Sequence, residues 1–358
     1  MKDYVELLQE LIRNRAVSQD AAAVDRSQDR MCAWLKARGI TNLTFEDCGD
    51  RKALFAANRP GKTQEVILNV HLDVVPADEE QFTPTVQDGW LYGRGSSDDL
   101  GNAVAVAEAL VRLKDAPIGI GVIFTADEEV GGSTTLAMVE RGYTATKLGL
   151  VLHCGDCTLV ALEKGILVFR LTAHGKACHS SRPWGGDNAI DKLLAGYGEL
   201  MRQFRQWPQA TSQDVWHVTM AACQIEGGHA ENQVPDTASL ILNCRYTDPD
   251  RREAIIDFVK AASGLEVEVT RGCEPVFCDR ESPLMQRLLQ TMQEVFPDRE
   301  CRFADMCGAT DARHMVSWKV PVAITGVKGK NVHGRGECVE LESIDKYIEW
   351  LVKAIGTL

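Results

Sequence analysis

The sequence predicts an α/β fold in which a doubly wound, mostly parallel mixed sheet is interrupted by an inserted α+β domain. Buried apolar runs alternate with helical patterns in the first 165 residues and again after residue 273. That alternation is typical of a parallel sheet with helices on both faces. Between these two parts, longer strand patterns follow one another with few helices, which is typical of an α+β unit with antiparallel strands.

Length and composition agree with this division. The chain has 358 residues, of which 45% are hydrophobic and 25% are charged. This is an ordinary balance for a globular protein, and the length suggests two domains. We therefore expect a main domain that comprises residues 1–165 and 274–358, and an inserted domain that comprises residues 166–273.

The expected elements begin with two helices and two short strands, which lead to the apolar run 66–75. A continuous run of this kind is typical of a buried strand in a parallel sheet. The next segment, 76–88, is polar and contains proline, so we expect a loop there. The later elements are expected at helix 102–113, strands 118–125, 148–152 and 166–173, helix 190–204, strands 215–225 and 237–246, helix 254–262, strand 265–270, a helix after 281, strand 320–325 and a closing helix over 344–355.

Charge and hydropathy exclude several classes of partner. The net charge is -12 and the sequence has no runs of lysine and arginine, which argues against a nucleic-acid partner. The N-terminus carries acidic residues where a signal peptide would be apolar, and no apolar run approaches the roughly 20 residues that cross a bilayer. We therefore expect no membrane partner and a cytoplasmic location.

The twelve cysteines are scattered along the chain. Cys154 and Cys157 form a C-x-x-C pair, but a structural zinc site would need a second pair, which the sequence lacks. In a reducing compartment, such cysteines are mostly free, buried and weakly polar. We expect two core thiols at this pair rather than a zinc site or a redox dithiol.

Polar groups that follow the predicted strands suggest a metal site. The run 66–75 contains the pair His71 and Asp73, and sheets of this class place their chemistry at such strand ends. His71 could bind a metal while Asp73 orients its ring; alternatively, the pair only caps the strand. The other groups are Asp98, Glu128, Glu129, Asp156 and His333. Each alone could be a helix cap, a solvated turn or a loop histidine, but together they suit zinc, and two ions that share a carboxylate need about five protein ligands.

The sequence closely resembles the dinuclear zinc family of acetylornithine deacetylase, succinyl-diaminopimelate desuccinylase, glutamate carboxypeptidase, aminoacylase and the cytosolic dipeptidases, metallopeptidase family 20. The resemblance spans nearly the whole chain and implies a zinc-exopeptidase-like main domain with a ferredoxin-like dimerisation domain inserted. The motifs that carry it are His71-Leu72-Asp73, Gly93 to Asp99, Asp127 to Gly131, Gly155-Asp156, Gly175 to Ser180, Gly227 to Pro235, Gly308 to Arg313, and Val332-His333 with Glu337.

The resemblance implies two Zn²⁺ per subunit, with Co²⁺ or Mn²⁺ as substitutes. It implies that His71 and Asp156 hold one ion, that Glu129 and His333 hold the other, and that Asp98 bridges both.

Asp73 is implied to lie behind His71, and Glu128 to be the general base that takes a proton from zinc-bound water and later delivers it to the leaving amine. Neighbouring residues on a regular strand point to opposite faces. The strand must therefore end before Glu128 and Glu129 if both side chains are to reach the site.

The inserted domain resembles the dimerisation domain of that family, which implies a homodimer through residues 166–273. The resemblance further implies that His179 reaches the active site of the partner subunit and stabilises an oxyanion there. Asn232 matches a substrate-contacting position. Arg313 could bind a substrate carboxylate with its planar fork, or could form a salt bridge with Asp311 or another acid.

Two departures bear on the substrate. Asp156 stands where deacylases and carboxypeptidases of the family usually have glutamate, and the pair Asp98-Asp99 is similar to the dipeptidase and glutamate-carboxypeptidase branch. Both features favour a dipeptidase-like or aminopeptidase-like exopeptidase. The short chain argues against a typical dipeptidase, and the segment Thr310 to Arg313 is similar to deacylases. The alternative is therefore an N-acyl amino acid deacylase of the acetylornithine deacetylase or succinyl-diaminopimelate desuccinylase type, or a glutamate-type carboxypeptidase. A catalytically dead, peptide-binding homologue is a more remote alternative, because every candidate ligand and the base are intact.

Overall fold

The computed structural model describes residues 2–153, 155–207 and 216–358. The chain divides into two compact units. The first takes the chain up to Leu162 together with Phe277–Asp305 and Thr310–Leu358, and the second comprises Glu163–Val276 and Met306–Ala309. No pattern in the sequence predicted that Met306–Ala309 belong to the second unit. We keep 166–273 as the proposed extent of the inserted domain.

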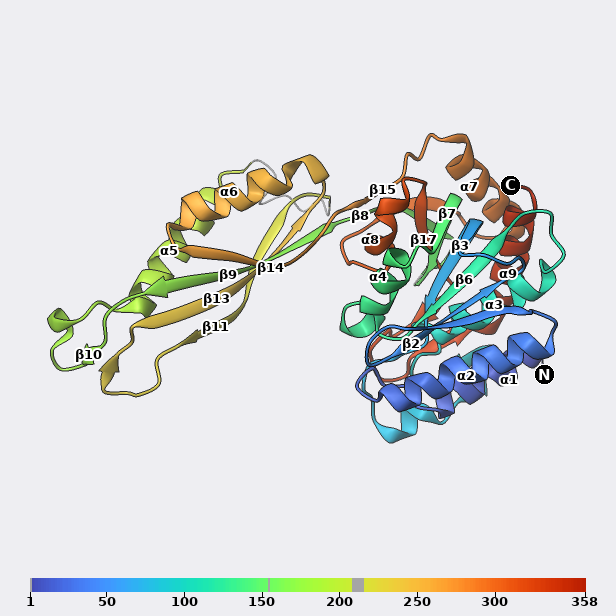
Figure 1. The fold of residues 1–358 in the computed structure, drawn as a ribbon, viewed down its shortest axis with the longest axis horizontal. Helices are drawn as coiled ribbons and strands as arrows, with labels where there is room; N and C mark the ends of the chain where they lie inside the picture. The colour runs from blue at the N-terminus through green and yellow to red at the C-terminus, as the bar shows by residue number, and fades with distance from the viewer. Residues whose placement is uncertain (1, 154, 208–215) are drawn as a thin grey trace. The chain divides into compact units, whose positions relative to one another are not determined.

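The first unit is built on a nine-stranded mixed sheet (Figure 1). In its centre, β3 pairs in parallel with β6 and with β7, and β7 pairs in parallel with β17. Antiparallel pairs lie outside this centre, so the prediction of a mostly parallel mixed sheet is confirmed for the part that carries the predicted site. In sheet order the strands are β1 (Asn42–Asp47), β2 (Lys52–Ala57), β6 (Ile120–Thr125), β3 (Thr63–His71), β7 (Thr144–Leu152), β17 (Val322–Thr325), β8 (Thr158–Glu163) and β15 (Val276–Phe277), while β16 (Arg302–Met306) also pairs with β8.

Helices bury both faces of this sheet. Val66, Leu68 and Val70 share one core cluster with residues of the helices that contain Val104 and Ile348, and the alternation of a strand turns the side chains between them to the opposite face. Helices α3 and α9 contact each other, α1 packs on α3, α7 packs on α9, and α4 packs with α8. The helices are α1 (Asp3–Arg13), α2 (Ala21–Ala37), α3 (Leu100–Arg112), α4 (Ser133–Glu140), α7 (Pro283–Val295), α8 (Ala312–Met315) and α9 (Leu341–Gly356).

A small antiparallel sheet occupies part of the predicted loop 76–88. Its order is β18 (Gly329–Lys330), β19 (Cys338–Glu340), β5 (Trp90–Tyr92) and β4 (Thr85–Gln87). The loop prediction was wrong here, because Asp88 and Gly89 both adopt positive φ angles and close a hairpin. An Asp-Gly pair is a strong signal for such a turn. The sheet brings the segment after β5 next to the segment before β19.

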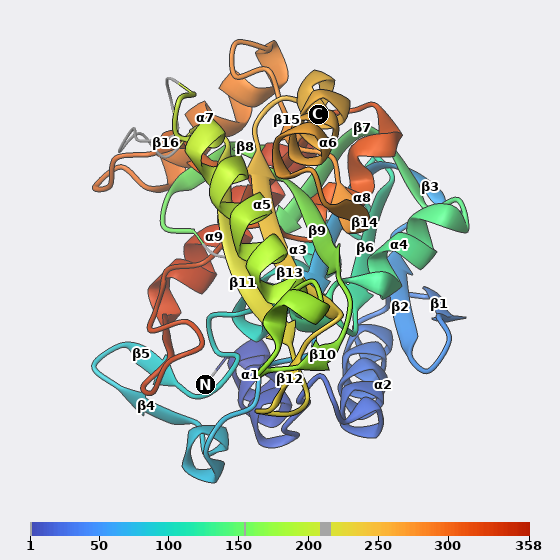
Figure 2. The same ribbon diagram turned by 90° about the vertical axis from the view of Figure 1, so that its left-hand side faces the viewer.

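The second unit is a four-stranded antiparallel sheet with two helices, in the βαββαβ order of a ferredoxin-like domain. Figure 2 shows α5 lying across the sheet. The unit has its own core, formed by residues such as Leu167, Phe169 and Leu171. Residue 215 of the predicted strand 215–225 lies outside the described residues. The sheet order is β11 (Thr219–Gly227), β13 (Thr237–Tyr246), β9 (Gly165–His174) and β14 (Glu266–Cys273), with helices α5 (Ala189–Phe204) and α6 (Arg252–Ser263).

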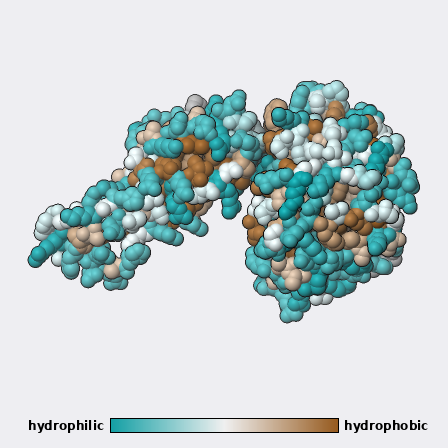
Figure 3. All heavy atoms as spheres, in the orientation of Figure 1, coloured by the Kyte–Doolittle hydropathy of each residue, from teal (hydrophilic) through white to brown (hydrophobic). Residues whose placement is uncertain are grey.

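The surface seen in Figure 3 is mostly hydrophilic, with hydrophobic residues gathered beside α6 of the second unit. No helix in the described part of the chain is long and apolar enough to cross a membrane.

Candidate metal centre

His71 is the last residue of β3, and its ring is held in a defined orientation. Its Nδ1 lies 3.0 Å from the backbone oxygen of Asp73, to which a protonated Nδ1 donates. Its Nε2 lies 3.1 Å from Oδ1 of Asp98. A hydrogen bond from one ring nitrogen leaves the other as the atom that can bind a metal. The side chain is buried, so the ring has little freedom to turn away.

Asp98 lies on the turn that precedes α3, and a buried acid far along the chain fixes that turn. Glu337 accepts hydrogen bonds from the backbone amides of Gly95, Ser97 and Asp98, at 3.0–3.1 Å. It also forms an ion pair with Arg94, at 2.5 Å. These contacts hold the backbone of Asp98 and direct its carboxylate toward His71. The small sheet of β5 and β19 makes the contacts possible, because it aligns the two segments.

Glu128 and Glu129 lie on η2, a short 3-10 helix over Glu128–Val130 that follows β6. The strand has therefore ended before the two acids, as we expected from their adjacency. Asp73 accepts hydrogen bonds from the backbone amides of Glu128, at 3.1 Å, and Glu129, at 3.4 Å. The hydroxyl of Ser18 donates a third hydrogen bond to Asp73, at 2.7 Å. Asp73 thus orients both the histidine before it and the turn that carries the two acids.

His333 lies on the loop between β18 and β19 and adopts a positive φ of 61°. Its Nε2 is 3.1 Å from Oε1 of Glu129 and 3.1 Å from Oδ2 of Asp98. The two oxygens of Asp98 therefore face different partners, because Oδ1 faces His71. Among the described residues, two groups could hold a metal ion: His71, Asp98, Asp99 and His153, and Asp98, Glu129 and His333.

These donors fit two zinc ions. Each group offers imidazole nitrogens and carboxylate oxygens within 4.8 Å of one another, which is the donor chemistry that zinc prefers. Asp98 belongs to both groups and offers one oxygen to each, as a bridging carboxylate must. In the first group, Asp99 has other partners, since Oδ2 accepts from the backbone amide of His71 and Oδ1 accepts from the side-chain amide of Asn102.

The electrostatics of the site follow from burial and from the close packing of charges. Burial raises the pKa of Glu129 to about 7. Burial also raises the pKa of Glu128, and the nearby charge of Asp311 adds to this effect. The hydrogen bond to Asp98 raises the pKa of His333 to about 9. Without a metal, the centre therefore holds protons at neutral pH that metal ions would displace.

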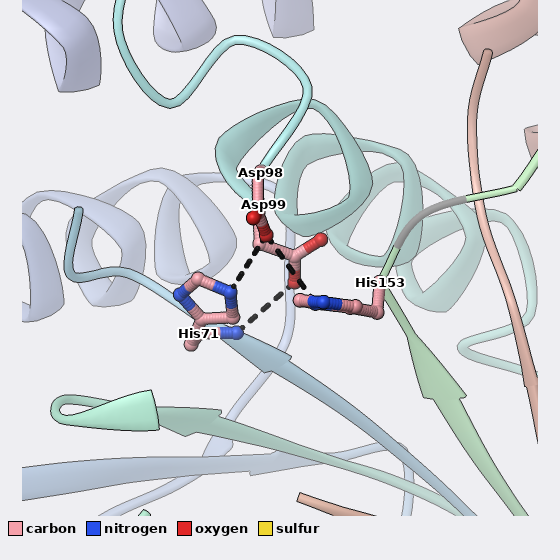
Figure 4. Close-up of side chains that lie close together, drawn as sticks. All are labelled: His71, Asp98, Asp99 and His153. Atoms are coloured by element: carbon pink, nitrogen blue, oxygen red, sulfur yellow. Dashed lines mark hydrogen bonds and ion pairs between the residues drawn. The ribbon is translucent and has the colours of Figure 1, made fainter. Parts of the chain in front are cut away.

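Asp156 lies outside both groups, which differs from the ligand set that the resemblance implied. Its Oδ1 is 3.0 Å from Nη1 of Arg299, and its Oδ2 is 4.0 Å from Nζ of Lys328. The side chain is 44% exposed. The residue that lies beside His71 and Asp98 is His153, directly after β7 (Figure 4).

His153 directly follows the predicted strand 148–152. The expectation that functional side chains lie at strand ends could therefore have identified it. It was missed because the family resemblance pointed to Asp156, three residues later. Cys154 lies outside the described residues. Cys157 is a buried free thiol, as expected of a core cysteine.

His179 and Asn232 lie together in the second unit. His179 ends β10 (Cys178–His179), which pairs with β12 (Gln233–Val234). The backbone oxygen of Asn232 accepts from the amide of Ser180 at 2.9 Å. His179 is exposed, and its Nδ1 accepts a hydrogen bond from the amide of Ser181 at 3.2 Å. The metal-binding groups all belong to the first unit.

Arg313 directs its guanidinium to backbone oxygens of its own unit. Nη1 donates to Thr310 at 2.9 Å and Nη2 donates to Gly131 at 2.8 Å. Both ends of the fork are therefore engaged. Asp311 is buried and accepts from the hydroxyl of Thr135, so it fixes α4 and α8 against each other rather than forming a direct ion pair with Arg313.

A mixed sheet with two metal-binding groups that share one carboxylate defines a metallohydrolase architecture. Residues 67–357 match the family described as Peptidase family M20/M25/M40. The chain belongs to this family. The match confirms the resemblance drawn from the motifs, and with it the prediction of a metal-dependent hydrolase that acts on amide or peptide bonds.

Individual proteins are similar to this chain in sequence or in fold. The chain is 27% identical over 344 residues to a probable succinyl-diaminopimelate desuccinylase of Staphylococcus aureus (strain MRSA252), covering 84% of this chain and 82% of the relative. The crystal structure of a tripeptidase from Staphylococcus aureus has a TM-score of 0.79 at 18% identity and covers 99% of this chain and 97% of its own. A dinuclear metal-binding peptidase of the M20 family from Bacillus subtilis has a TM-score of 0.69 at 12% identity, covering 99% of this chain and 97% of its own.

Proposed function

We propose that this protein is a dinuclear zinc exopeptidase that hydrolyses the amide bond of a small peptide. The observation that supports this most directly is the position of Asp98, whose two carboxylate oxygens face two separate groups of metal-binding side chains. His71 belongs to one group, and Glu129 and His333 belong to the other. When bound, the two ions would polarise the scissile carbonyl and acidify water.

Glu128 is proposed as the general base. Its carboxyl group is largely buried beside the metal-binding acids, and burial raises its pKa. A carboxyl group with a raised pKa can take a proton and return it near neutral pH more readily than an ordinary glutamate. Asp73 accepts a hydrogen bond from the backbone amide of Glu128 and so fixes the position from which the Glu128 side chain extends.

The preference for a peptide rests on the pair Asp98-Asp99. The other sequence argument, aspartate at position 156, loses weight because Asp156 lies outside the metal-binding groups. A second candidate is deacylation of an N-acyl amino acid. It is favoured by the 27% identity to a probable succinyl-diaminopimelate desuccinylase.

A substrate panel separates the two candidates. The zinc-loaded protein is assayed for release of free amine from dipeptides and tripeptides, and from N-acetyl and N-succinyl amino acids. We expect the peptides to be hydrolysed with the higher kcat/KM. Turnover of the acylated compounds alone would replace the peptidase by the deacylase. No chelator-sensitive turnover of any compound would overturn both and leave a peptide-binding homologue.

We further propose a cytoplasmic homodimer through the second unit. Strand β11 is an edge strand with no partner on its outer side in the described part of the chain, and its residues from Ala221 to Gly227 are exposed. Apolar Ile225 is 58% exposed there, and Leu194 on α5 is 51% exposed. An exposed edge of this kind is a template for pairing with a second chain. Cys157, Cys244 and Cys278 are buried free thiols, which agrees with a reducing compartment.

Sedimentation of the Ile225→Lys variant tests the dimer, because a charge on an edge strand opposes pairing. We expect a monomer, whereas Glu268→Lys on the opposite edge strand β14 should stay dimeric. A dimer that is unchanged by Ile225→Lys would contradict the edge assignment.

His179 is proposed to act in the partner subunit's site, and Asn232 to contact substrate from the same loop pair. Mixing two inactive variants, His179→Ala and Glu128→Gln, tests this. In a mixed dimer, one site would have the intact base of one subunit and the intact histidine of the other. We expect activity to return on mixing. Continued inactivity of a verified mixed dimer would place His179 outside the partner's site.

A further inference from the structure

Strand register places His153 opposite His71 at one edge of the sheet. Strands β3 and β7 are parallel neighbours, and Asn69 pairs with Val151. Two residues further on, the same register sets His71 beside His153. Figure 4 shows the two rings approaching the carboxylate of Asp98 from opposite sides. Oδ1 of Asp98 is 3.1 Å from Nε2 of His71 and 3.3 Å from Nδ1 of His153.

Nδ1 of His153 is buried and makes no hydrogen bond to any of the described residues. The backbone of His153 is fixed on both sides, since its amide donates to Thr325 at 2.8 Å and its oxygen accepts from the side chain of Asn102. A buried polar atom without a hydrogen bond is costly unless something binds it. The position of this nitrogen near a shared carboxylate oxygen matches a metal ligand.

Asp156 is committed to other contacts. Its carboxylate is ion-paired with Arg299, which also pairs with Glu340, and Lys328 lies near both acids. To reach a metal, Asp156 would have to leave a guanidinium that already neutralises it. The four side chains form a balanced set of two acids and two bases that does not need a metal.

We infer that His153, rather than Asp156, is the third protein ligand of the ion held by His71 and Asp98. This inference rests on the proposed dinuclear function. An imidazole in place of a carboxylate removes one negative charge from the ligand set. The centre would therefore be more positive, which strengthens the attraction of an anionic substrate group.

Metal binding is the readout that tests this assignment, independently of activity. The apo-protein is titrated with Zn²⁺ by calorimetry, and bound zinc is counted by mass spectrometry after dialysis. We expect two ions in wild type and in Asp156→Asn. In His153→Ala we expect one of the two ions to bind roughly ten-fold or more weakly. His229→Ala, at an exposed histidine of the second unit, is the matched control and should bind as wild type.

A second measurement guards against a fold defect in His153→Ala. Free imidazole should enter the space left by the side chain and restore the affinity for the more weakly bound zinc ion. The circular dichroism spectrum should stay unchanged throughout. Two tightly bound ions in His153→Ala, or the loss of an ion in Asp156→Asn, would overturn the assignment. If wild type itself binds no zinc, the proposed function fails instead.

Discussion

Asp73 accepts a hydrogen bond from the backbone amide of Glu128, at 3.1 Å, and so ties the end of β3 to the turn after β6. The same carboxylate accepts from the amide of Glu129 and lies 3.4 Å from Nδ1 of His71. One acid thus positions a proposed metal ligand from each group and the proposed base. This explains why a residue without a metal contact of its own belongs to the site.

Replacing Asp73 by asparagine should weaken both zinc binding and catalysis, because Asp73 holds the turn that carries Glu128 and Glu129. The side-chain amide of asparagine has one acceptor oxygen, and its NH₂ group would face a backbone amide or the hydroxyl of Ser18, all of which donate to Asp73. We expect zinc affinity and kcat each to fall about 10- to 100-fold. Calorimetry and initial rates measure the two effects. Asp115→Asn, at an exposed aspartate, should change neither, and wild-type zinc affinity in Asp73→Asn would contradict the positioning role.

The Glu128→Gln variant separates metal binding from proton transfer. Glutamine keeps the size of the side chain but cannot take a proton, while the ligands on both sides stay in place. We expect both zinc ions to remain and kcat to fall by at least about 10²- to 10⁴-fold, the usual contribution of a general base. Zinc analysis and steady-state rates are compared with Glu140→Gln, an exposed glutamate at the end of α4. Wild-type turnover in Glu128→Gln would remove the base assignment.

Zinc loading should release protons, and its affinity should rise with pH. The hydrogen bond to Asp98 raises the pKa of His333 to about 9. Burial opposes the charge on His71, but hydrogen bonds to Asp73 and Asp98 still raise its pKa well above the ordinary value. The ring of His333 is therefore protonated in the metal-free protein at pH 7, and the raised pKa of His71 favours its protonated form as well. Zinc binds only the neutral form of each ring.

Calorimetry in buffers of different ionisation enthalpy counts the released protons. We expect at least one proton per subunit at pH 7, from His333, with further release from His71 and from Glu129, whose pKa burial raises to about 7. Fewer protons should be released as the pH passes 9 and His333 becomes neutral without metal. The apparent zinc affinity should increase over the same interval. His229→Ala should show the same proton count as wild type, and binding without proton release at pH 7 would contradict the charged state of His333.

Several candidate metal ligands lie at positions that the sequence pattern predicts, at the end of a strand or at the start of a helix. His71, Asp98 and Glu129 lie after predicted strands or on the turn before a helix, and the structure brings them together as parallel strand ends require. His153 obeys the same rule, but the resemblance to relatives drew attention to Asp156. Which of two nearby residues faces the centre depends on backbone angles and on partners such as Arg299, and these are not local properties of the sequence.

The contacts of Glu337 are another feature that the sequence could not supply. Its partners lie about 240 residues earlier, and only the pairing of β5 with β19 aligns the two segments. The Asp-Gly hairpin that forms β4 and β5 could have been predicted from turn chemistry. The long-range pairing that makes it useful could not, since nothing in two three-residue strands specifies which distant segment they join.

Replacing Glu337 by glutamine should destabilise the fold and weaken both metal positions. Oε1 of Glu337 accepts from the amides of Ser97 and Asp98, and Oε2 accepts from Gly95 and Arg94. Whichever oxygen becomes NH₂, a donor then faces donors, and the charge of buried Arg94 loses its partner. Breaking a buried ion pair in this way costs roughly 3–5 kcal/mol.

Urea unfolding of the metal-free protein measures that loss without a contribution from bound zinc, and a zinc titration follows. We expect the free energy of unfolding to fall by roughly 3 kcal/mol or more. Both ions should bind less tightly, because Asp98, the carboxylate shared by the two groups, loses the hydrogen bond that holds its backbone. Glu342→Gln, at a glutamate that is 66% exposed, is the control and should unfold as wild type. Weakening of only one ion in Glu337→Gln would show that Asp98 does not bridge the two positions.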